Sequence, residues 1–123
     1  MRIFLDTSLL SDRSLLHLRD EIVRHLARDD TFHGSVITHF QIMWGYVIAG
    51  RSPARYENFL RKTGMEIVPL TKSDADDAAN FKPIRADLLD ALIAASARRH
   101  KAIIWTADKD FLKFLPKSGV RIF

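Results

Sequence analysis

The chain has 123 residues, of which 47% are hydrophobic and 28% charged, with no cysteine and a formal net charge of +4. This length suits one domain with its own core, and the lack of cysteine excludes disulfides, thiolate metal sites and cysteine nucleophiles. No apolar stretch nears the roughly 20 residues of a membrane span, and no signal peptide precedes the first strand-like run. We therefore expect a cytoplasmic protein with no membrane partner.

Apolar runs of strand length alternate with segments of helical periodicity. In chain order, strands are predicted at residues 2–5, 36–37, 65–68, 102–106 and 120–123. Helices are predicted at residues 15–30, 38–50, 52–64, 73–79 and 87–100, followed by a short helix or turn at 108–115. Strands that alternate with helices imply parallel pairing, so we expect one α/β domain over residues 1–123, with three α/β/α layers and a short, mostly parallel sheet.

Cap and turn residues set several of the predicted helix ends. Thr38 is the expected N-cap of the helix that ends at Gly50, and Gly64 is expected to close the next helix. Asp87 stands three residues before Asp90, as in a capping box, and is expected to act as an N-cap.

Acidic residues lie where a parallel sheet would gather them. Asp6 follows the first strand, Asp108 follows the strand at 102–106, and Asp90 lies in the first turn of a helix, so all three can reach one edge of the sheet. Asp110 adds a further oxygen two residues after Asp108. Grouped carboxylates repel one another unless a cation neutralises them, and all-oxygen ligation favours Mg²⁺ or Mn²⁺. These acids predict a metal-dependent phosphodiesterase.

Simpler explanations remain for some of these acids. The helix dipole alone favours Asp90, and Asp108 and Asp110 can serve as caps of a short helix. A phosphoacceptor receiver domain would carry paired acids after its first strand and a lysine after its last, and this chain has neither. A haloacid-dehalogenase-like phosphatase would carry Asp-x-Asp after its first strand, where Asp6 is followed by Thr7 and Ser8.

Three segments resemble the motifs of one family. Ile3-Phe4-Leu5-Asp6-Thr7-Ser8 resembles the opening motif of PIN domains, especially of VapC-like toxins. Asp90-Ala91-Leu92-Ile93-Ala94-Ala95-Ser96-Ala97 resembles their central acidic helix, and Thr106-Ala107-Asp108-Lys109-Asp110-Phe111 resembles their late acidic segment. The resemblance implies Mg²⁺- or Mn²⁺-dependent RNA cleavage by the toxin half of a toxin–antitoxin pair. It also implies a homodimer that binds a small antitoxin protein.

The resemblance also assigns roles to residues. Asp6, Asp90 and Asp108 would hold the metal ion, with Asp110 assisting. The hydroxyls of Thr7, Ser8 and Thr106 would hydrogen-bond to carboxylates or to water. Basic residues near these segments are candidates for contacts with the RNA backbone: Arg13, Arg51, Lys109 and Lys113. The apolar helix at residues 40–48 is the candidate surface for a protein partner.

Gln41 departs from the family pattern. PIN domains usually carry a Glu on the helix after the second strand, and Gln41 stands at the corresponding place in this chain. An amide keeps one carbonyl acceptor but loses the negative charge, so a second metal ion becomes doubtful. The alternative prediction is therefore a catalytically weakened PIN-like module that binds RNA or a protein.

Overall fold

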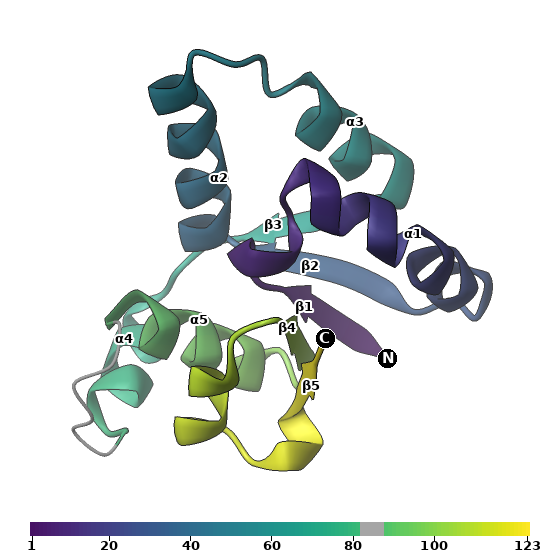
Figure 1. Ribbon diagram of the computed structural model, residues 1–123. Coiled ribbons are helices and arrows are strands. Elements are labelled where there is room, and N and C mark those ends of the chain that lie inside the picture. Colours follow the sequence, from purple (N-terminus) through teal and green to yellow (C-terminus); the bar gives the residue numbers. More distant parts are fainter. Residues whose placement is uncertain (82–87) are drawn as a thin grey trace.

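The computed structural model describes residues 1–81 and 88–123 (Figure 1). Its strands are β1 Arg2–Leu5, β2 Thr31–Ser35, β3 Glu66–Val68, β4 Ile103–Thr106 and β5 Val120–Ile122. Its α-helices are α1 Asp12–Ala27, α2 Val36–Ala49, α3 Ala54–Thr63, α4 Lys72–Ala79 and α5 Leu88–Arg99. Short 3₁₀ helices complete the fold: η1 Thr7–Leu9, η2 Lys109–Lys113 and η3 Lys117–Gly119.

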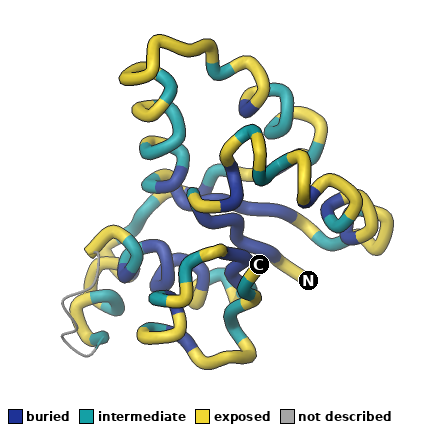
Figure 2. The backbone as a smooth tube through the Cα atoms, in the orientation of Figure 1, coloured by how far each residue is buried: buried dark blue, intermediate teal, exposed yellow. Residues whose placement is uncertain are grey.

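The five strands form one sheet in the order β3-β2-β1-β4-β5, and every neighbouring pair is parallel. Side chains of β1 alternate between the two faces of this sheet. Ile3 and Leu5 pack in a cluster with residues of α1 and α3, whereas Phe4 packs in a second cluster with residues of α5 and η2. Helices therefore cover both faces, and the predicted α/β/α layering is confirmed. Figure 2 shows the buried strands between the more exposed helices.

The second strand does not lie where the sequence predicts it. Val36 and Ile37 belong to the first turn of α2, and the N-cap is Ser35, whose hydroxyl accepts a hydrogen bond from the Ile37 amide at 3.1 Å. The predicted N-cap, Thr38, is instead a buried residue inside the helix. The strand is instead formed by the more polar segment Thr31–Ser35. This segment is buried because it pairs with β1 on one side and β3 on the other, which its own side chains do not indicate.

Helix ends follow the local sequence signals more closely. Gly50 and Gly64 end α2 and α3 in the left-handed conformation, with φ of 63° and 65°, where glycine carries no Cβ penalty. At the start of α4, Thr71 and Asp74 form a reciprocal capping box, so this helix begins at Lys72, just before the predicted start. Asp87, the predicted cap of α5, lies outside the described residues.

A salt bridge fixes α4 against α5. The Asp74 carboxylate is 1% exposed and accepts from Arg99 Nε at 2.7 Å. Burial raises the pKa of Asp74, but Arg99 and the Thr71 cap outweigh it, and the net shift is downward. The pair holds the start of α4 against the end of α5. Across the described residues, no helix has the length and apolarity needed to cross a membrane.

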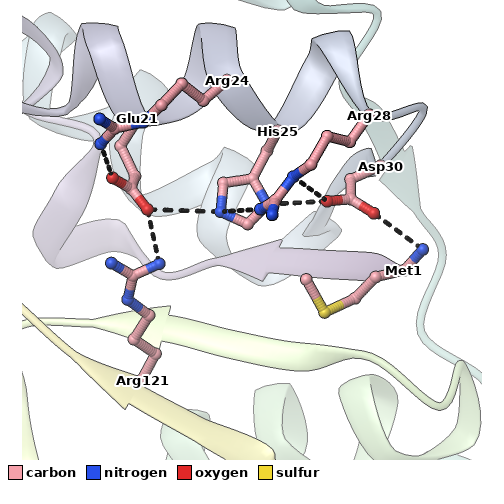
Figure 3. A network of polar contacts seen from close by, with 7 residues as sticks. All are labelled: Met1, Glu21, Arg24, His25, Arg28, Asp30 and Arg121. Carbon is pink, nitrogen blue, oxygen red and sulfur yellow. Dashed lines mark hydrogen bonds and ion pairs between the residues drawn. The ribbon is translucent and has the colours of Figure 1, made fainter.

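A polar network lies where β1 and β2 begin (Figure 3). His25, on α1, has its Nδ1 2.8 Å from Asp30 Oδ2 and its Nε2 3.3 Å from Glu21 Oε1. The Met1 ammonium lies 3.0 Å from Asp30 Oδ1, and Arg121 Nη1 lies 2.7 Å from Glu21 Oε1. A hydrogen bond from Arg121 is the main cause that lowers the pKa of Glu21 to about 2. The network joins α1 to the starts of β1 and β2 and to β5.

Two histidines pack beside Phe4 on the α5 side of the sheet. The rings of His33 and His100 stack with centroids 6.4 Å apart, and each lies within 6 Å of the Phe4 ring. His33 Nδ1 and His100 Nε2 are buried and have no hydrogen-bond partner among the described residues. Burial is the main cause that lowers the pKa of both histidines, although Glu66 opposes the shift at each.

We expect stability to fall as the pH is lowered from about 7.5 to 5.5. Because the folded pKa of each histidine lies below the unfolded value of about 6.5, the unfolded chain takes up protons first and is favoured below that pH. His100→Leu removes one of the two groups and should reduce the decline. Melting temperatures of both proteins at the two pH values test this, and a parent chain that is as stable at pH 5.5 as at 7.5 contradicts it.

Candidate functional site

Asp6 lies at the carboxyl end of β1 and is 4% exposed. Its backbone amide donates to Trp105 O at 3.0 Å, which joins the ends of β1 and β4. Its Oδ2 accepts from Ser8 Oγ at 2.8 Å and from Thr106 Oγ1 at 2.9 Å. Within the described residues, its Oδ1 accepts no hydrogen bond, so one carboxylate oxygen is fixed by hydroxyls while the other remains available.

Thr106 connects Asp6 to the late acidic segment. The Thr106 hydroxyl is fully buried at the end of β4, donates to Asp6 and accepts from the Asp108 amide at 2.9 Å. Ser8 Oγ accepts from the Ala107 amide at 3.0 Å and thus adds a second link between the two segments. The structure therefore brings together residues 6–8 and 106–108, which lie about a hundred positions apart in the chain.

Asp108 and Asp110 also have structural roles. Asp108 Oδ1 accepts from the Asp110 amide at 2.9 Å and caps η2. Asp110 Oδ1 lies 3.0 Å from Lys113 Nζ, with both side chains about half exposed, and such surface pairs contribute little to stability. Asp108 is thus held close to the Asp6 segment, while the Asp110 charge is directed toward Lys113.

Gln41 is linked to the same edge through Thr7. Thr7 Oγ1 donates to Gln41 Oε1 at 2.6 Å, so the residue that follows Asp6 contacts α2 directly. Because Ser35 caps α2 at the carboxyl end of β2, the start of this helix faces the edge of the sheet where Asp6 lies. The expected position of the family's Glu is therefore occupied by an amide that is already hydrogen-bonded to η1.

Asp90 lies in the first turn of α5 and is half-buried. α5 runs back toward the start of β4 and packs against β4, α2 and η2. Its first turn therefore lies toward the carboxyl ends of the strands, and negative charge is favoured at a helix N-terminus. The role of Asp90 as a metal ligand stays a prediction.

The oxygen donors suit a hard divalent cation held largely by water. Residues 1–81 and 88–123 contain no group of three or more His, Asp or Glu side chains that could hold a metal ion. Mg²⁺, however, commonly binds through one or two carboxylates and keeps several waters. The available Asp6 oxygen, with one further carboxylate from a neighbouring segment, fits this mode of binding better than a cage of carboxylates.

The basic candidates differ in their surroundings. Arg51 Nη2 lies 3.2 Å from Asp12 Oδ2, and Lys113 is paired with Asp110. Arg13 and Lys109 are exposed and form no ion pair with any described residue. Sequence reasoning missed Asp12, which also accepts from the Tyr46 hydroxyl at 3.1 Å, because these partners are 34 or more positions away and leave no local pattern.

Known structures share this fold. VapBC2 from Rickettsia felis, bound to a DNA fragment from its promoter, has a TM-score of 0.77 at 18% identity over 99% of this chain and 98% of that one. DNA-bound VapBC from Salmonella typhimurium has a TM-score of 0.66 at 20% identity, over 100% of this chain and 97% of that one. VapBC-5 from Mycobacterium tuberculosis has a TM-score of 0.64 at 22% identity, over 99% of this chain and 97% of that one. Similarity at these identities shows the fold alone.

Comparison of the sequence with family models also identifies the family. No curated protein matches the chain. The family model of the PIN domain, however, matches residues 3–114 and so includes the segments around Asp6, Gln41, Asp90 and Asp108. Because this match spans nearly the whole chain, the protein belongs to the PIN domain family.

Proposed function

We propose that the protein is a Mg²⁺- or Mn²⁺-dependent ribonuclease and the toxin of a VapBC-type toxin–antitoxin pair. The observation that carries this proposal is the linkage of Asp6 to Asp108 through the buried Thr106 hydroxyl, within a PIN domain. The direct test is cleavage of single-stranded RNA by the purified protein with Mn²⁺ and with a chelator. Cleavage that continues unchanged in the chelator would refute the metal requirement.

The protein's own groups would position the reacting phosphate. Asp6 and one further acid, Asp90 or Asp108, would hold the cation, with water as its other ligands. When bound, the cation lowers the pKa of a water and polarises the phosphate. Ser8 and Thr106 keep the Asp6 carboxylate in one orientation, since both hydroxyls donate to the same oxygen. A carboxylate held in advance loses little conformational freedom when it binds an ion.

Gln41 would limit the strength of metal binding. The expected Glu would add a charged oxygen, whereas the amide is neutral and its carbonyl already accepts from Thr7. The charge of Asp110 is partly offset by its ion pair with Lys113. The proposed site would therefore hold one cation firmly, and a second cation would lack a carboxylate on α2.

Gln41→Glu should tighten Mn²⁺ binding by on the order of tenfold and raise the cleavage rate, because the number of charged ligands sets cation affinity. Gln41→Ala is the matched control, since it also removes the amide but adds no charge. Calorimetric titration with Mn²⁺ and a cleavage assay measure the two effects. If the Glu and Ala variants bind Mn²⁺ alike, residue 41 does not contribute a ligand.

A protein partner would bind the exposed apolar side of α2. Phe40 and Trp44 are 61% and 57% exposed and stack with ring centroids 6.0 Å apart, and Val47 and Ile48 continue this side. The similar structures are of VapBC toxin–antitoxin systems, which favours a small antitoxin as a partner. The homodimer is proposed from the resemblance to VapC-like toxins alone. Light scattering of the chain, alone and with such an antitoxin, would detect both assemblies. A monomer that binds no antitoxin contradicts this part of the proposal.

A catalytically weakened PIN-like binding module is the second candidate, and Gln41 favours it. Such a module would bind RNA or protein without taking up a cation. Mn²⁺ titration separates the two, because the proposed nuclease must bind Mn²⁺ and the module need not. Failure to bind Mn²⁺ at millimolar concentration would support the module.

A further inference from the structure

A pocket of about 430 Å³ opens between the start of α1 and the helix α2. This volume lies within the range of about 300–1,000 Å³ that is usual for small-molecule sites. Its lining includes Leu10, Asp12, Arg13, Gln41, Tyr46 and Arg51. One wall therefore comes from the segment that follows Asp6, and the other comes from the helix that carries Gln41.

Gln41 lines the pocket and presents a hydrogen-bond donor next to the candidate site. Gln41 Oε1 accepts from Thr7, and the Gln41 Nε2 has no hydrogen-bond partner among the described residues. The amide nitrogen is therefore available to an acceptor such as a phosphate oxygen. Without a bound cation, a Glu at this position would present only acceptors and would weaken the binding of a phosphate there.

The lining of the pocket also carries positive charge, from Arg13 and Arg51. Arg51 and Tyr46 donate to the two oxygens of Asp12, which offsets the charge of this acid and leaves its oxygens engaged. The Arg51 side chain is still 66% exposed and keeps further N–H groups for another partner. Arg13 is also exposed and lines the same pocket, which therefore offers two guanidinium groups to an anion.

The floor of the pocket is apolar. Leu10 is fully buried beneath it, and Ile42 and Ala49 of α2 line it together with the tyrosine ring. An apolar lining, an amide donor and two guanidinium groups match a nucleotide of an RNA strand, which carries a flat base on a sugar that links two phosphates. The cationic rim and the contact with the Asp6 segment favour RNA over an apolar peptide.

We propose that this pocket holds the nucleotide next to the scissile phosphate of a single-stranded RNA. The inference rests on the proposed ribonuclease function and adds a binding site for the strand. Gln41 donates to the phosphate nearer Asp6, Arg13 and Arg51 contact the next phosphate, and the base packs over Leu10 and Ile42. Gln41 thus positions the substrate, at the place where PIN domains usually carry a Glu.

Gly45 allows the pocket to be filled without disturbing the acids. It lines the pocket, its φ is not positive, and a Cβ added there would meet no atom within 4 Å. Gly45→Phe should therefore fold and place a ring where the base would lie. Its affinity for a labelled RNA octamer, measured without metal so that no cleavage occurs, should fall by roughly tenfold.

Ala75→Phe is the matched control, because it adds the same ring at an exposed position of α4, on the other face of the sheet. It should bind RNA like the parent chain, with a similar melting temperature. Gly45→Ala adds only a methyl group and should keep most of the affinity. Arg13→Ala should lower the salt dependence of binding by about one phosphate contact.

Unchanged RNA affinity of a folded Gly45→Phe protein would overturn the pocket assignment. If the Gly45→Phe protein loses antitoxin binding but keeps its RNA affinity, the assignment is also overturned, since the pocket would then bind a protein. Failure of the ribonuclease proposal is recognised separately, as absence of metal-dependent cleavage by the parent chain. A parent chain that binds no RNA at all would refute the pocket directly.

Discussion

Asp6→Asn is expected to reduce metal-dependent RNA cleavage by roughly a hundredfold or more, since losses of ten- to hundredfold already follow from changes around a metal ligand. The amide is neutral and binds a divalent cation weakly. Asn can still accept from Ser8 Oγ and Thr106 Oγ1, so the junction of β1 and β4 should persist. Initial cleavage rates at saturating Mn²⁺, with the melting temperature of each protein, measure the effect.

Asp20→Asn provides the control for charge. Asp20 is exposed on α1, outside the proposed site, so this variant loses the same charge and should cleave RNA at the parent rate. Mn²⁺ titration should show weaker binding only for the Asp6 variant. If both variants cleave at the parent rate, Asp6 does not hold the metal and the assigned site is wrong.

Trp105→Ala is expected to have the largest effect on stability, about 3–5 kcal/mol of the free energy of unfolding. Trp105 lies on β4 and is 1% exposed. Its ring meets those of His25, Phe32 and Phe123 at centroid distances of 4.8, 5.6 and 5.0 Å, and the Arg121 guanidinium lies 5.0 Å from it. Truncation leaves a cavity among three rings and removes the packing surface of an arginine.

The Trp105→Ala loss is a large part of the 5–15 kcal/mol typical of whole domains, and should lower the melting temperature by roughly 10 °C or more. Trp105→Phe keeps an aromatic ring and should lose clearly less. Urea unfolding followed by circular dichroism measures both. A Trp105→Ala protein that unfolds at the parent urea concentration would show that this part of the core is not tightly packed.

The fold was predictable wherever the local sequence carried the signal. The strand before Asp6 contains the apolar run Ile3-Phe4-Leu5. Gly50 and Gly64 mark helix ends because few other residues adopt a positive φ readily. The second strand was not predictable, because Thr31–Ser35 is polar and is buried only by its neighbours in the sheet. Val36 and Ile37 have β-branched side chains, which are typical of strands, but Ser35 is the N-cap of a helix that begins at Val36.

The candidate site was predictable to the extent that it depends on strand ends. Asp6 and Asp108 each follow a strand, and parallel pairing brings those strand ends together. Contacts such as Thr7 with Gln41 are set by how α2 packs against η1, which no short segment encodes. The pairing of Asp110 with Lys113 was also unexpected, although their spacing of three residues on a helix is a usual one for ion pairs.

The Thr106 hydroxyl joins the segments that carry Asp6 and Asp108. Because one oxygen atom touches both the Asp6 side chain and the Asp108 amide, neither segment can shift far without pulling on the other. Small sliding motions between the two strands would then carry both carboxylates along together. The spacing of the Asp6 side chain and the Asp108 backbone would then stay nearly constant while the rest of the molecule fluctuates.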